Sequence, residues 1–198
     1  MTIEDYIKRH LLESSKVKRI TIKKCSYQIK EAALAVVDIY FKKGGTVFLF
    51  GNGGSAADAQ HIAGELFSLF RLRRIPLSAN ALTTDTSVLT SISNDLGYEY
   101  VFSRQLEALA TPKDLVIALS TSGNSPNVIL GVKLAKSRGI KTIALTGQDG
   151  GKLARVVDIA IKVPSNDIGH IQEAHTAIGH IICGLVEEVL FGEGGIDV

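Results

Sequence analysis

Two groups of side chains in this sequence have the types and spacing that proton transfer or metal binding requires. His61 and Glu65 stand four residues apart in a segment of helical periodicity, so they share one face of a helix. Such a pair can supply metal ligands, or a base and its partner, although in isolation it is more often a hydrogen-bonded surface pair. Three of the five histidines lie between residues 170 and 180, in a long apolar segment. His180 is flanked there by isoleucines, where a neutral core histidine is the default.

Two loops of small residues have the composition of a phosphate site. The first, GNGGS at 51–55, follows an apolar run and leads into a helix that we expect to begin near Ala56, with Ser55 as its N-cap. The second, STSGNSP at 120–126, has four hydroxyl groups within six residues, with Ser125 as the expected cap and Pro126 at the first helical position. Because helix N-termini favour anions, the two loops together predict a phosphate site.

Neither loop completes a nucleotide-binding motif. GNGGSA matches the dinucleotide pattern G-x-G-x-x-A, but that pattern expects an acidic residue about 20 positions later to hold a ribose. Positions 66–84 contain no acidic residue, and Asp85 comes late. The sequence also lacks GxxxxGK[ST], so a nucleotide-triphosphate machine is not indicated.

The elements that must position these groups alternate between strand and helix. Apolar runs at 46–50, 115–119, 142–145 and 157–161, with a shorter one near 77–82, are typical of strands covered on both faces. We therefore predict a three-layer α/β/α sandwich with a roughly five-stranded parallel sheet, which binds ligands beyond the carboxyl ends of its strands. Residues 3–42 predict one or two N-terminal helices. Residues 167–190 predict a long C-terminal helix that packs in a core or against another subunit.

Length and composition fit a single domain, which we expect to span residues 1–198. The 198 residues (21.2 kDa) are 45% hydrophobic and 21% charged, and a net charge of +2 does not suggest a nucleic-acid partner. The one basic cluster, RLRR at 71–74, is interpreted as a solvated surface. Cys25 and Cys183 have no CxxC partner, which argues against a disulfide framework or a Cys-based zinc site. Without a signal peptide or a membrane-spanning run, the sequence predicts a cytoplasmic protein with no membrane partner.

Taken together, the motifs resemble the sugar isomerase (SIS) fold and, within it, the phosphoheptose isomerase family. The similar segments span roughly residues 30–190 and are, in order, FGNGGSAADAQHIAGEL, SNDLGYEYVFSRQLEAL, ALSTSGNSPNV, ALTGQDGGKLA and IQEAH followed by a second His. The resemblance implies conversion of sedoheptulose 7-phosphate to D-glycero-D-manno-heptose 7-phosphate, the first step of nucleotide-activated heptose biosynthesis. It also implies a homotetramer with sites at the subunit interfaces, to whose packing residues 1–42 contribute.

The resemblance assigns roles to particular residues. The implied substrate contacts are Asn52, Gly53, Gly54, Glu65, Asn94, Asp95, Ser120, Thr121, Ser122, Ser125 and Gln172, to which the capping argument adds Ser55. The implied ligands of one Zn²⁺ per subunit are His61, Glu65, Gln172 and His180. Glu65 and His180 are also the acid–base candidates. Where relatives place Asp or another polar residue ahead of IQE, this chain has Gly169, so any role of that side chain is lost here.

Aldose–ketose isomerisation suits these groups. The reaction removes a proton from the carbon beside a carbonyl and returns it to the neighbouring carbon, and the intervening enediolate needs positive charge or donors at its oxygens. Glu65 can shuttle that proton, His180 can transfer protons on oxygen or help to open the sugar ring, and zinc can act as a Lewis acid. Two difficulties remain. A zinc-bound Glu65 is a poorer base, and Gln172 lies about 12 Å from His180 along one helix, so the two meet one metal only by leaning together or by coming from different subunits.

Two non-enzymatic functions stand as alternatives. A replication-initiator-associated protein has almost the same phosphate loops and works by protein–protein binding. It has Asn at the position of His180, so His180 favours catalysis. A sugar-phosphate-sensing module of a regulator would come with a DNA-binding domain, which 198 residues do not accommodate.

Overall fold

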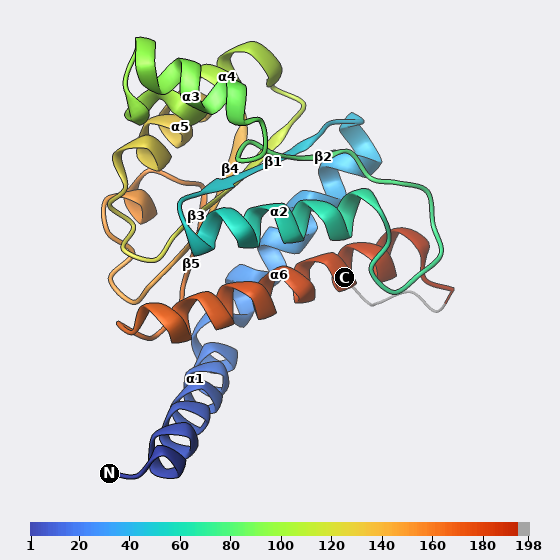
Figure 1. The fold of residues 1–198 in the computed structure, drawn as a ribbon. Coiled ribbons are helices and arrows are strands. Elements are labelled where there is room, and N and C mark those ends of the chain that lie inside the picture. The colour runs from blue at the N-terminus through green and yellow to red at the C-terminus, as the bar shows by residue number, and fades with distance from the viewer. Residues whose placement is uncertain (194–198) are drawn as a thin grey trace.

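A five-stranded parallel sheet lies between two layers of helices in the computed structural model, which describes residues 1–193 (Figure 1). The strands are β1 (Val47–Gly51), β2 (Ala79–Ala81), β3 (Leu115–Ser120), β4 (Lys141–Thr146) and β5 (Ile159–Lys162). Their order across the sheet is β2-β1-β3-β4-β5, and every neighbouring pair is parallel. The predicted strands, including the short one near 77–82, and the α/β/α class are confirmed.

Alternate residues of each strand face opposite helical layers, because successive side chains of a strand point to opposite sides. In β1, Val47 and Leu49 belong to one apolar core, and Phe48 and Phe50 belong to the other. The helices on the first side are α1 (Ile3–Asp38), α2 (Gly54–Phe67) and α6 (Ile168–Phe191). Those on the second side are α3 (Thr86–Asp95), α4 (Val101–Leu109) and α5 (Pro126–Ser137). Short 3-10 turns cover Tyr98–Tyr100 and Leu153–Arg155.

The predicted N-terminal helical segment is one helix, α1, continued by a π-helical turn at Ile39–Lys43. Thr2 caps α1: its hydroxyl accepts the N–H of Asp5, and the Asp5 carboxylate accepts the N–H of Thr2. The buried residues of α1 begin only at Ser14. The first turns therefore extend away from the sheet, as Figure 1 shows at the N-terminal end.

The predicted C-terminal helix is confirmed as α6. Among the residues described, it is the one helix long and apolar enough to cross a membrane by length and composition, and 44% of its most apolar window is buried inside the molecule. It packs against both α1 and α2. A core helix of a folded domain meets the same test, so the packing accounts for its composition.

Candidate active site

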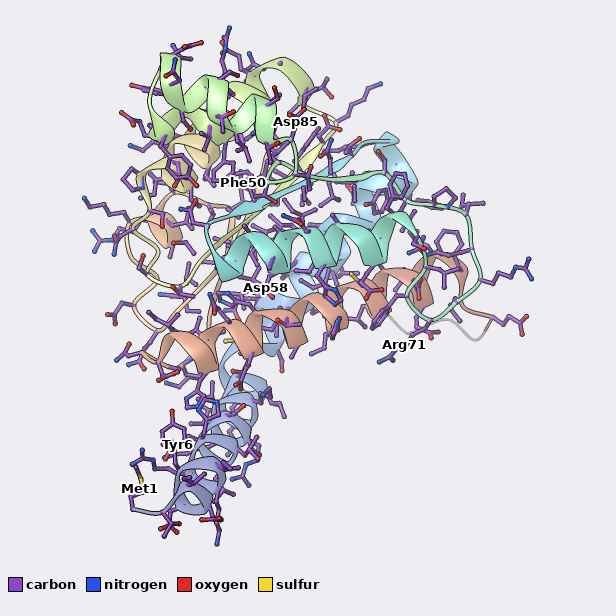
Figure 2. All side chains as sticks on the ribbon, viewed as in Figure 1. Met1, Tyr6, Phe50, Asp58, Arg71 and Asp85 are labelled. Carbon is purple, nitrogen blue, oxygen red and sulfur yellow. The ribbon has the colours of Figure 1, made fainter. Side chains whose placement is uncertain are left out.

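Helices α2 and α6 lie side by side and run in the same direction, so their side chains meet at successive levels along the seam between them (Figure 1). At the first level the Gln172 amide lies against Gly54: a Cβ built on Gly54 would be 2.4 Å from Gln172 Nε2. At the second level Thr176 Oγ1 donates to Asp58 Oδ1 at 2.7 Å. Figure 2 shows Asp58 in the space between the two helices. Burial raises the pKa of this carboxyl.

The third level brings together three of the four residues that the resemblance assigns to zinc. His61 Nε2 and His180 Nε2 lie 2.7 Å apart, and Glu65 Oε1 is 3.5 Å from His61 Nε2. Two imidazole nitrogens approach this closely only when a proton or a cation lies between them. One ligand atom of each residue is within 4.8 Å of the other two, and two imidazoles with a carboxylate are a donor set that zinc binds. The described residues therefore include a possible metal-binding triad.

The triad is open to solvent on one side. The His61 side chain is 46% exposed and that of Glu65 is 22% exposed. His180 is half-buried and faces His61, so the core-histidine interpretation of His180 is wrong. A polar molecule can therefore reach these three side chains.

The core histidine of α6 is instead His175, which is fully buried. Its Nε2 lies 3.2 Å from the carbonyl oxygen of Thr146, at the end of β4, so this nitrogen carries the proton. Burial lowers the pKa of His175 to about 4 despite that hydrogen bond. The imidazole is therefore neutral at pH 7.

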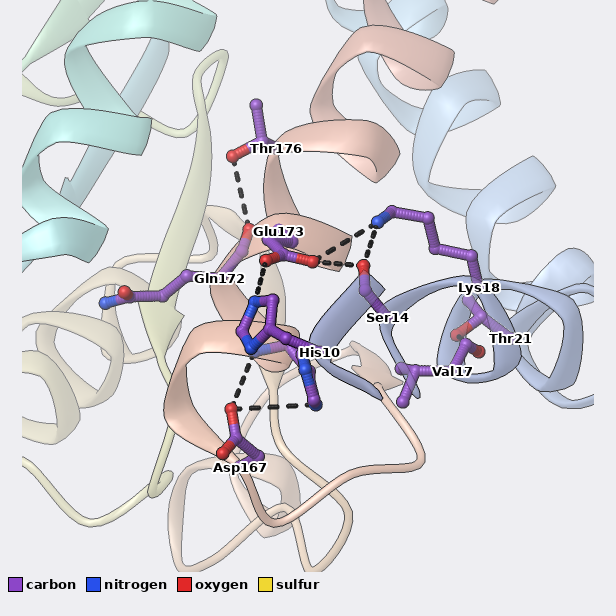
Figure 3. Close-up of polar contacts among 10 residues, drawn as sticks. His10, Ser14, Val17, Lys18, Thr21, Asp167, Gln172, Glu173 and Thr176 are labelled. Atoms are coloured by element: carbon purple, nitrogen blue, oxygen red, sulfur yellow. Dashed lines mark hydrogen bonds and ion pairs between the residues drawn. The ribbon is translucent and has the colours of Figure 1, made fainter. Parts of the chain in front are cut away.

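Gln172, the fourth assigned ligand, lies two levels away from the triad in this chain. It projects from α6 towards the beginning of α2, as Figure 3 shows. Because α2 and α6 run in the same direction, Gln172 and His180, eight positions apart on α6, lie at different levels of the seam. Gln172 lies beside the first glycine loop, and His180 lies with His61 and Glu65.

The first glycine loop leaves the carboxyl end of β1 beside the end of β3, since Gly51 pairs with Leu119. The expected Ser55 cap is wrong. Helix α2 begins at Gly54 after an N-cap at Gly53, whose φ is 56°, and Ser55 is buried in the first turn. The helix leaves the strand so sharply that a Cβ on Gly51 would lie 2.8 Å from the Cβ of Ser55. Small residues at both positions make this turn possible.

The second loop leaves the carboxyl end of β3. Ser125 is the N-cap residue of α5 and Pro126 occupies the first turn, as predicted. The Ser125 hydroxyl does not cap the helix but lies 3.2 Å from the Ser120 hydroxyl. The Thr121 carbonyl accepts the N–H of Gly147 at 2.9 Å, which ties the loop to the end of β4.

A pair of side-chain amides joins the two loops. Asn52 Nδ2 donates to Asn127 Oδ1 at 2.9 Å, and Asn127 Nδ2 donates to Asn52 Oδ1 at 2.8 Å. A pocket of about 300 Å³ opens beside Thr121 and Ser122. Its lining includes the polar side chains of Gln148, Asp149, Ser165 and Asn166. Hydroxyls, amides and a helix N-terminus at one edge of the sheet form a site suited to a phosphate ester.

Asn94 and Asp95 end α3 on the other side of the sheet, and both are exposed. Asn94 Nδ2 donates to Asp95 Oδ1 at 2.8 Å. From this region Tyr98 is the residue that reaches the glycine loop, because its hydroxyl donates to Asn52 Oδ1 at 3.2 Å.

At Gly169 a Cβ would lie 3.2 Å from Asp167 Oδ1. Asp167 caps α6 and accepts the N–H of His170 at 2.9 Å, so a carboxylate is still present at this end of the helix.

The N-terminal part of α1 is fastened beside Gln172 by the Glu173 carboxylate (Figure 3). Ser14 donates to this carboxylate, His10 Nε2 lies 3.1 Å from Oε1, and Lys18 Nζ lies 3.4 Å from Oε2. The hydrogen bond from Ser14, with those from His10 and Lys18, lowers the pKa of Glu173 to about 2. Glu173 is therefore ionised and holds α1 on α6.

The surface interpretation of the RLRR cluster is wrong for Arg74. Arg71 and Arg73 are exposed, but the Arg74 side chain is 0% exposed, and its Nε donates to Glu187 Oε1 at 2.8 Å. Burial raises the pKa of Glu187, but hydrogen bonds from the backbone N–H groups of residues 70–72 and from Arg74 outweigh it and lower the pKa. Figure 2 shows Arg71 on the loop that follows α2.

Asp58 and Thr176 were not predicted as site residues. Their positions did carry a signal, because Asp58 lies three residues before His61 and Thr176 four before His180, on the same helical faces. No pattern in the sequence pointed to Glu187 as the partner of Arg74.

The fold and this site define a SIS-domain protein, and residues 11–147 match the SIS domain family. The phosphoheptose isomerase of Aneurinibacillus thermoaerophilus is 50% identical over 191 residues, which cover 96% of either chain. The structure of phosphoheptose isomerase GmhA from Neisseria gonorrhoeae has a TM-score of 0.89 at 40% identity, covering 95% of this chain and 100% of its own. That of a phosphoheptose isomerase from Francisella tularensis has a TM-score of 0.91 at 36% identity, with the same coverage. The chain belongs to the phosphoheptose isomerase family.

Proposed function

We propose that this chain interconverts sedoheptulose 7-phosphate and D-glycero-D-manno-heptose 7-phosphate, an aldose–ketose isomerisation that begins nucleotide-activated heptose biosynthesis. The observation that carries the proposal is the convergence of His61, Glu65 and His180 on the seam that starts at the glycine loop. Relatives named phosphoheptose isomerase at about half identity over nearly the whole chain support it.

The phosphate group of the substrate binds at the carboxyl ends of β1 and β3. The proposed contacts there are Asn52, Gly53, Gly54, Ser55, Ser120, Thr121, Ser122 and Ser125. Asn94 and Asp95, at the end of α3, are further proposed contacts with the sugar part of the substrate. Backbone N–H groups and hydroxyls of the two loops donate to phosphate oxygens, which fixes one end of a seven-carbon chain. The other end then extends along the seam towards Gln172 and the triad.

Proton transfer falls to Glu65 and His180. Glu65, as a carboxylate, removes the proton from the carbon beside the carbonyl, and the carboxylic acid so formed returns it to the neighbouring carbon. His180 exchanges protons with the substrate oxygens, because imidazole accepts and donates protons near neutral pH. His61 and Glu65 are four residues apart and so share one face of α2. This spacing holds the Glu65 carboxylate in place beside His180.

The proposed cofactor is one Zn²⁺ per subunit, held by His61, Glu65 and His180, with Gln172 as the further ligand proposed. Bound zinc would supply Lewis-acid stabilisation of negative charge on the substrate oxygens. Two imidazole nitrogens and a carboxylate oxygen within 4.8 Å of one another fit this ion.

We also propose that the functional unit is a cytoplasmic homotetramer, in which each chain forms one SIS domain over residues 1–198 and residues 1–42 help to pack the subunits. The sites then lie at subunit interfaces, so that a neighbouring chain completes each of them. The apolar side chains exposed on the first turns of α1 support this proposal.

The decisive experiment incubates the purified protein with sedoheptulose 7-phosphate, with and without added zinc, and follows aldose formation by NMR. We expect the heptose 7-phosphate to appear. Absence of turnover from folded, zinc-loaded protein would overturn the proposal in favour of a non-catalytic binding protein.

Removal of the metal tests the cofactor separately. We expect zinc to copurify at about one ion per site, and chelation followed by dialysis to lower turnover, which added Zn²⁺ restores. Full activity of thoroughly stripped protein would exclude the zinc role while leaving the isomerase assignment intact.

A further inference from the structure

The loop that follows α2, residues 68–76, is fastened to α6 by a buried ion pair. Arg74 Nε lies 2.8 Å from Glu187 Oε1, and both side chains are at most 1% exposed. The same carboxylate accepts three consecutive backbone N–H groups, from Phe70 and Arg71 at 2.8 Å and from Leu72 at 3.1 Å. A carboxylate with this many donors fixes the course of the loop, because every displacement breaks several charge-assisted hydrogen bonds.

The guanidinium of Arg74 ties the same loop to α2. Its Nη2 donates to the carbonyl of Glu65 at 2.8 Å, and its Nη1 donates to the carbonyls of Ser68 and Ile75 at 3.3 and 2.9 Å. One buried arginine therefore connects the backbone of an acid–base residue, the loop and, through Glu187, helix α6.

The fastened loop places the ring of Phe70 on the imidazole of His180. The two ring centroids are 5.3 Å apart and the planes are inclined by 20°. Gly184, one turn further along α6, also lies against this ring, since a Cβ there would be 3.6 Å from Phe70 Cε1, an ordinary packing distance. The His61 ring meets His180 edge-on, with centroids 5.0 Å apart.

These contacts restrict rotation of the His180 ring. An imidazole with one neighbour stacked on its face and another at its edge keeps its Nε2 directed at His61. A phenyl ring does this without a hydrogen bond to either ring nitrogen, so Nε2 keeps its contact with His61 and Phe70 does not compete for Nδ1.

We propose that Phe70 is a positioning residue for His180, and that the Arg74–Glu187 pair holds Phe70 in place. The inference rests on the proposed function for the role of His180, but the packing of the two rings can be tested without it. This proposal makes turnover depend on Phe70, which lies outside the two phosphate loops and outside the His61–Glu65–His180 triad.

The kinetic test compares Phe70→Ala with Phe70→Tyr and with Ile75→Ala, a matched control on an exposed side chain of the same loop. We expect Phe70→Ala to lower kcat about tenfold, the size of effect seen when the support of a site residue is removed. The KM for the sugar phosphate should change by less than about twofold, because the phosphate loops lie elsewhere. Phe70→Tyr, which keeps the stacked ring, and Ile75→Ala should behave as wild type. A kcat of Phe70→Ala within about twofold of wild type would overturn the proposal.

The second test needs no turnover. In metal-free protein labelled with ¹³C-histidine, the ring signals of His180 are assigned by their loss in His180→Gln. Phe70→Ala should shift these signals and give ¹³C relaxation that reports a more mobile ring, whereas Ile75→Ala should do neither. Unchanged signals and unchanged mobility would refute the positioning role. An inactive wild-type protein whose His180 ring still depends on Phe70 would refute the isomerase function alone.

Discussion

Helix α6 gives two histidines, five residues apart, opposite chemical properties. Five residues turn a helix by about 140° beyond one full turn, so His175 and His180 point in different directions. His175 faces the sheet, is fully buried and donates to a strand carbonyl. His180 faces α2, where solvent and a second imidazole reach it. The isoleucines beside His180 in the sequence favoured a core position for that residue, whereas the histidine in the core is His175, which stands between Ala174 and Thr176.

The first prediction for a single residue concerns His180→Gln. Glutamine keeps a hydrogen-bonding side chain of similar length but cannot accept a proton near pH 7. We expect kcat to fall at least about 100-fold, within the range that one acid–base group contributes. Binding of the phosphosugar, measured by calorimetry, should persist, because the phosphate loops are untouched. Unchanged turnover would remove His180 from the mechanism.

The second concerns the pH dependence of stability at His175. Its pKa is lowered by burial from 6.5 to about 4, so between these values the unfolded chain binds a proton that the folded chain does not. This contribution to stability is complete above pH 6.5 and is lost as the pH falls towards 4, by about 3 kcal/mol in all. Urea unfolding at pH 7.5, 6.5, 5.5 and 4.5 measures it.

His175→Gln is the control for this slope, because glutamine can donate to the Thr146 carbonyl but does not titrate. The difference in the free energy of unfolding between wild type and this variant carries the His175 contribution, and wild type should lose stability relative to the variant as the pH falls from 6.5 towards 4. The carboxylates, including Asp58 with its raised pKa and Asp158 and Glu187 with lowered ones, titrate alike in both proteins and cancel in this difference. Equal slopes in the two proteins would contradict the assignment.

For helices and strands, the local sequence pattern predicted the architecture well. The predictions failed where the structure depends on a residue distant in the sequence or on the local backbone conformation. Apolar runs located all five strands because both faces of the sheet are covered. Ser55 was placed wrongly because a cap depends on the backbone direction at Gly53, which composition does not encode. Arg74 was placed on the surface because its partner, Glu187, is 113 positions away. Gln172 and His180 lie at different levels of the seam between α2 and α6. This could be recognised only once the two helices were known to run in the same direction.

For the connections between helices and strands, we compare two glycines that have a left-handed backbone conformation. Gly123 (φ +64°) lies in the second phosphate loop, where a Cβ would be 2.1 Å from the backbone oxygen of Gly150. Gly139 (φ +73°) has nothing within 4 Å of its Cβ position. Alanine at either site costs about 1–2 kcal/mol for the left-handed conformation. Only Gly123→Ala must also push the second phosphate loop away from the Gly150–Gly151 segment that follows β4, so it should raise KM at least about tenfold.

Steady-state kinetics and urea unfolding of the two variants separate these effects. Gly139→Ala should lose stability with an unchanged KM. If Gly123→Ala has the same KM as Gly139→Ala, the close approach of the loops does not shape the phosphate site.

In the molecule as a whole, helix α1 has apolar side chains that its own chain leaves uncovered. Its first turns expose Ile3, Tyr6, Ile7, Leu11 and Leu12, each more than half exposed. A groove of about 660 Å³ runs between α1 and α6, lined largely by aliphatic side chains. A folded chain in water rarely leaves such a surface uncovered, which is the ground for the proposal that neighbouring subunits bury it. The Glu173 carboxylate, which holds α1 on α6 next to Gln172, places this surface close to the proposed site.

The last prediction follows from that surface. Leu11→Glu places a charge in the α1–α6 groove, and Lys23→Glu places the same residue at an exposed position of α1 that does not line the groove. We expect wild type and Lys23→Glu to have four times the mass of the 21.2 kDa chain by light scattering. Leu11→Glu should dissociate while keeping its helical circular dichroism, because its side chain contributes little to the core of its own chain. If a neighbouring subunit completes each site, turnover of Leu11→Glu should fall with its mass on dilution. A fully active dissociated variant would show that each chain contains a complete site.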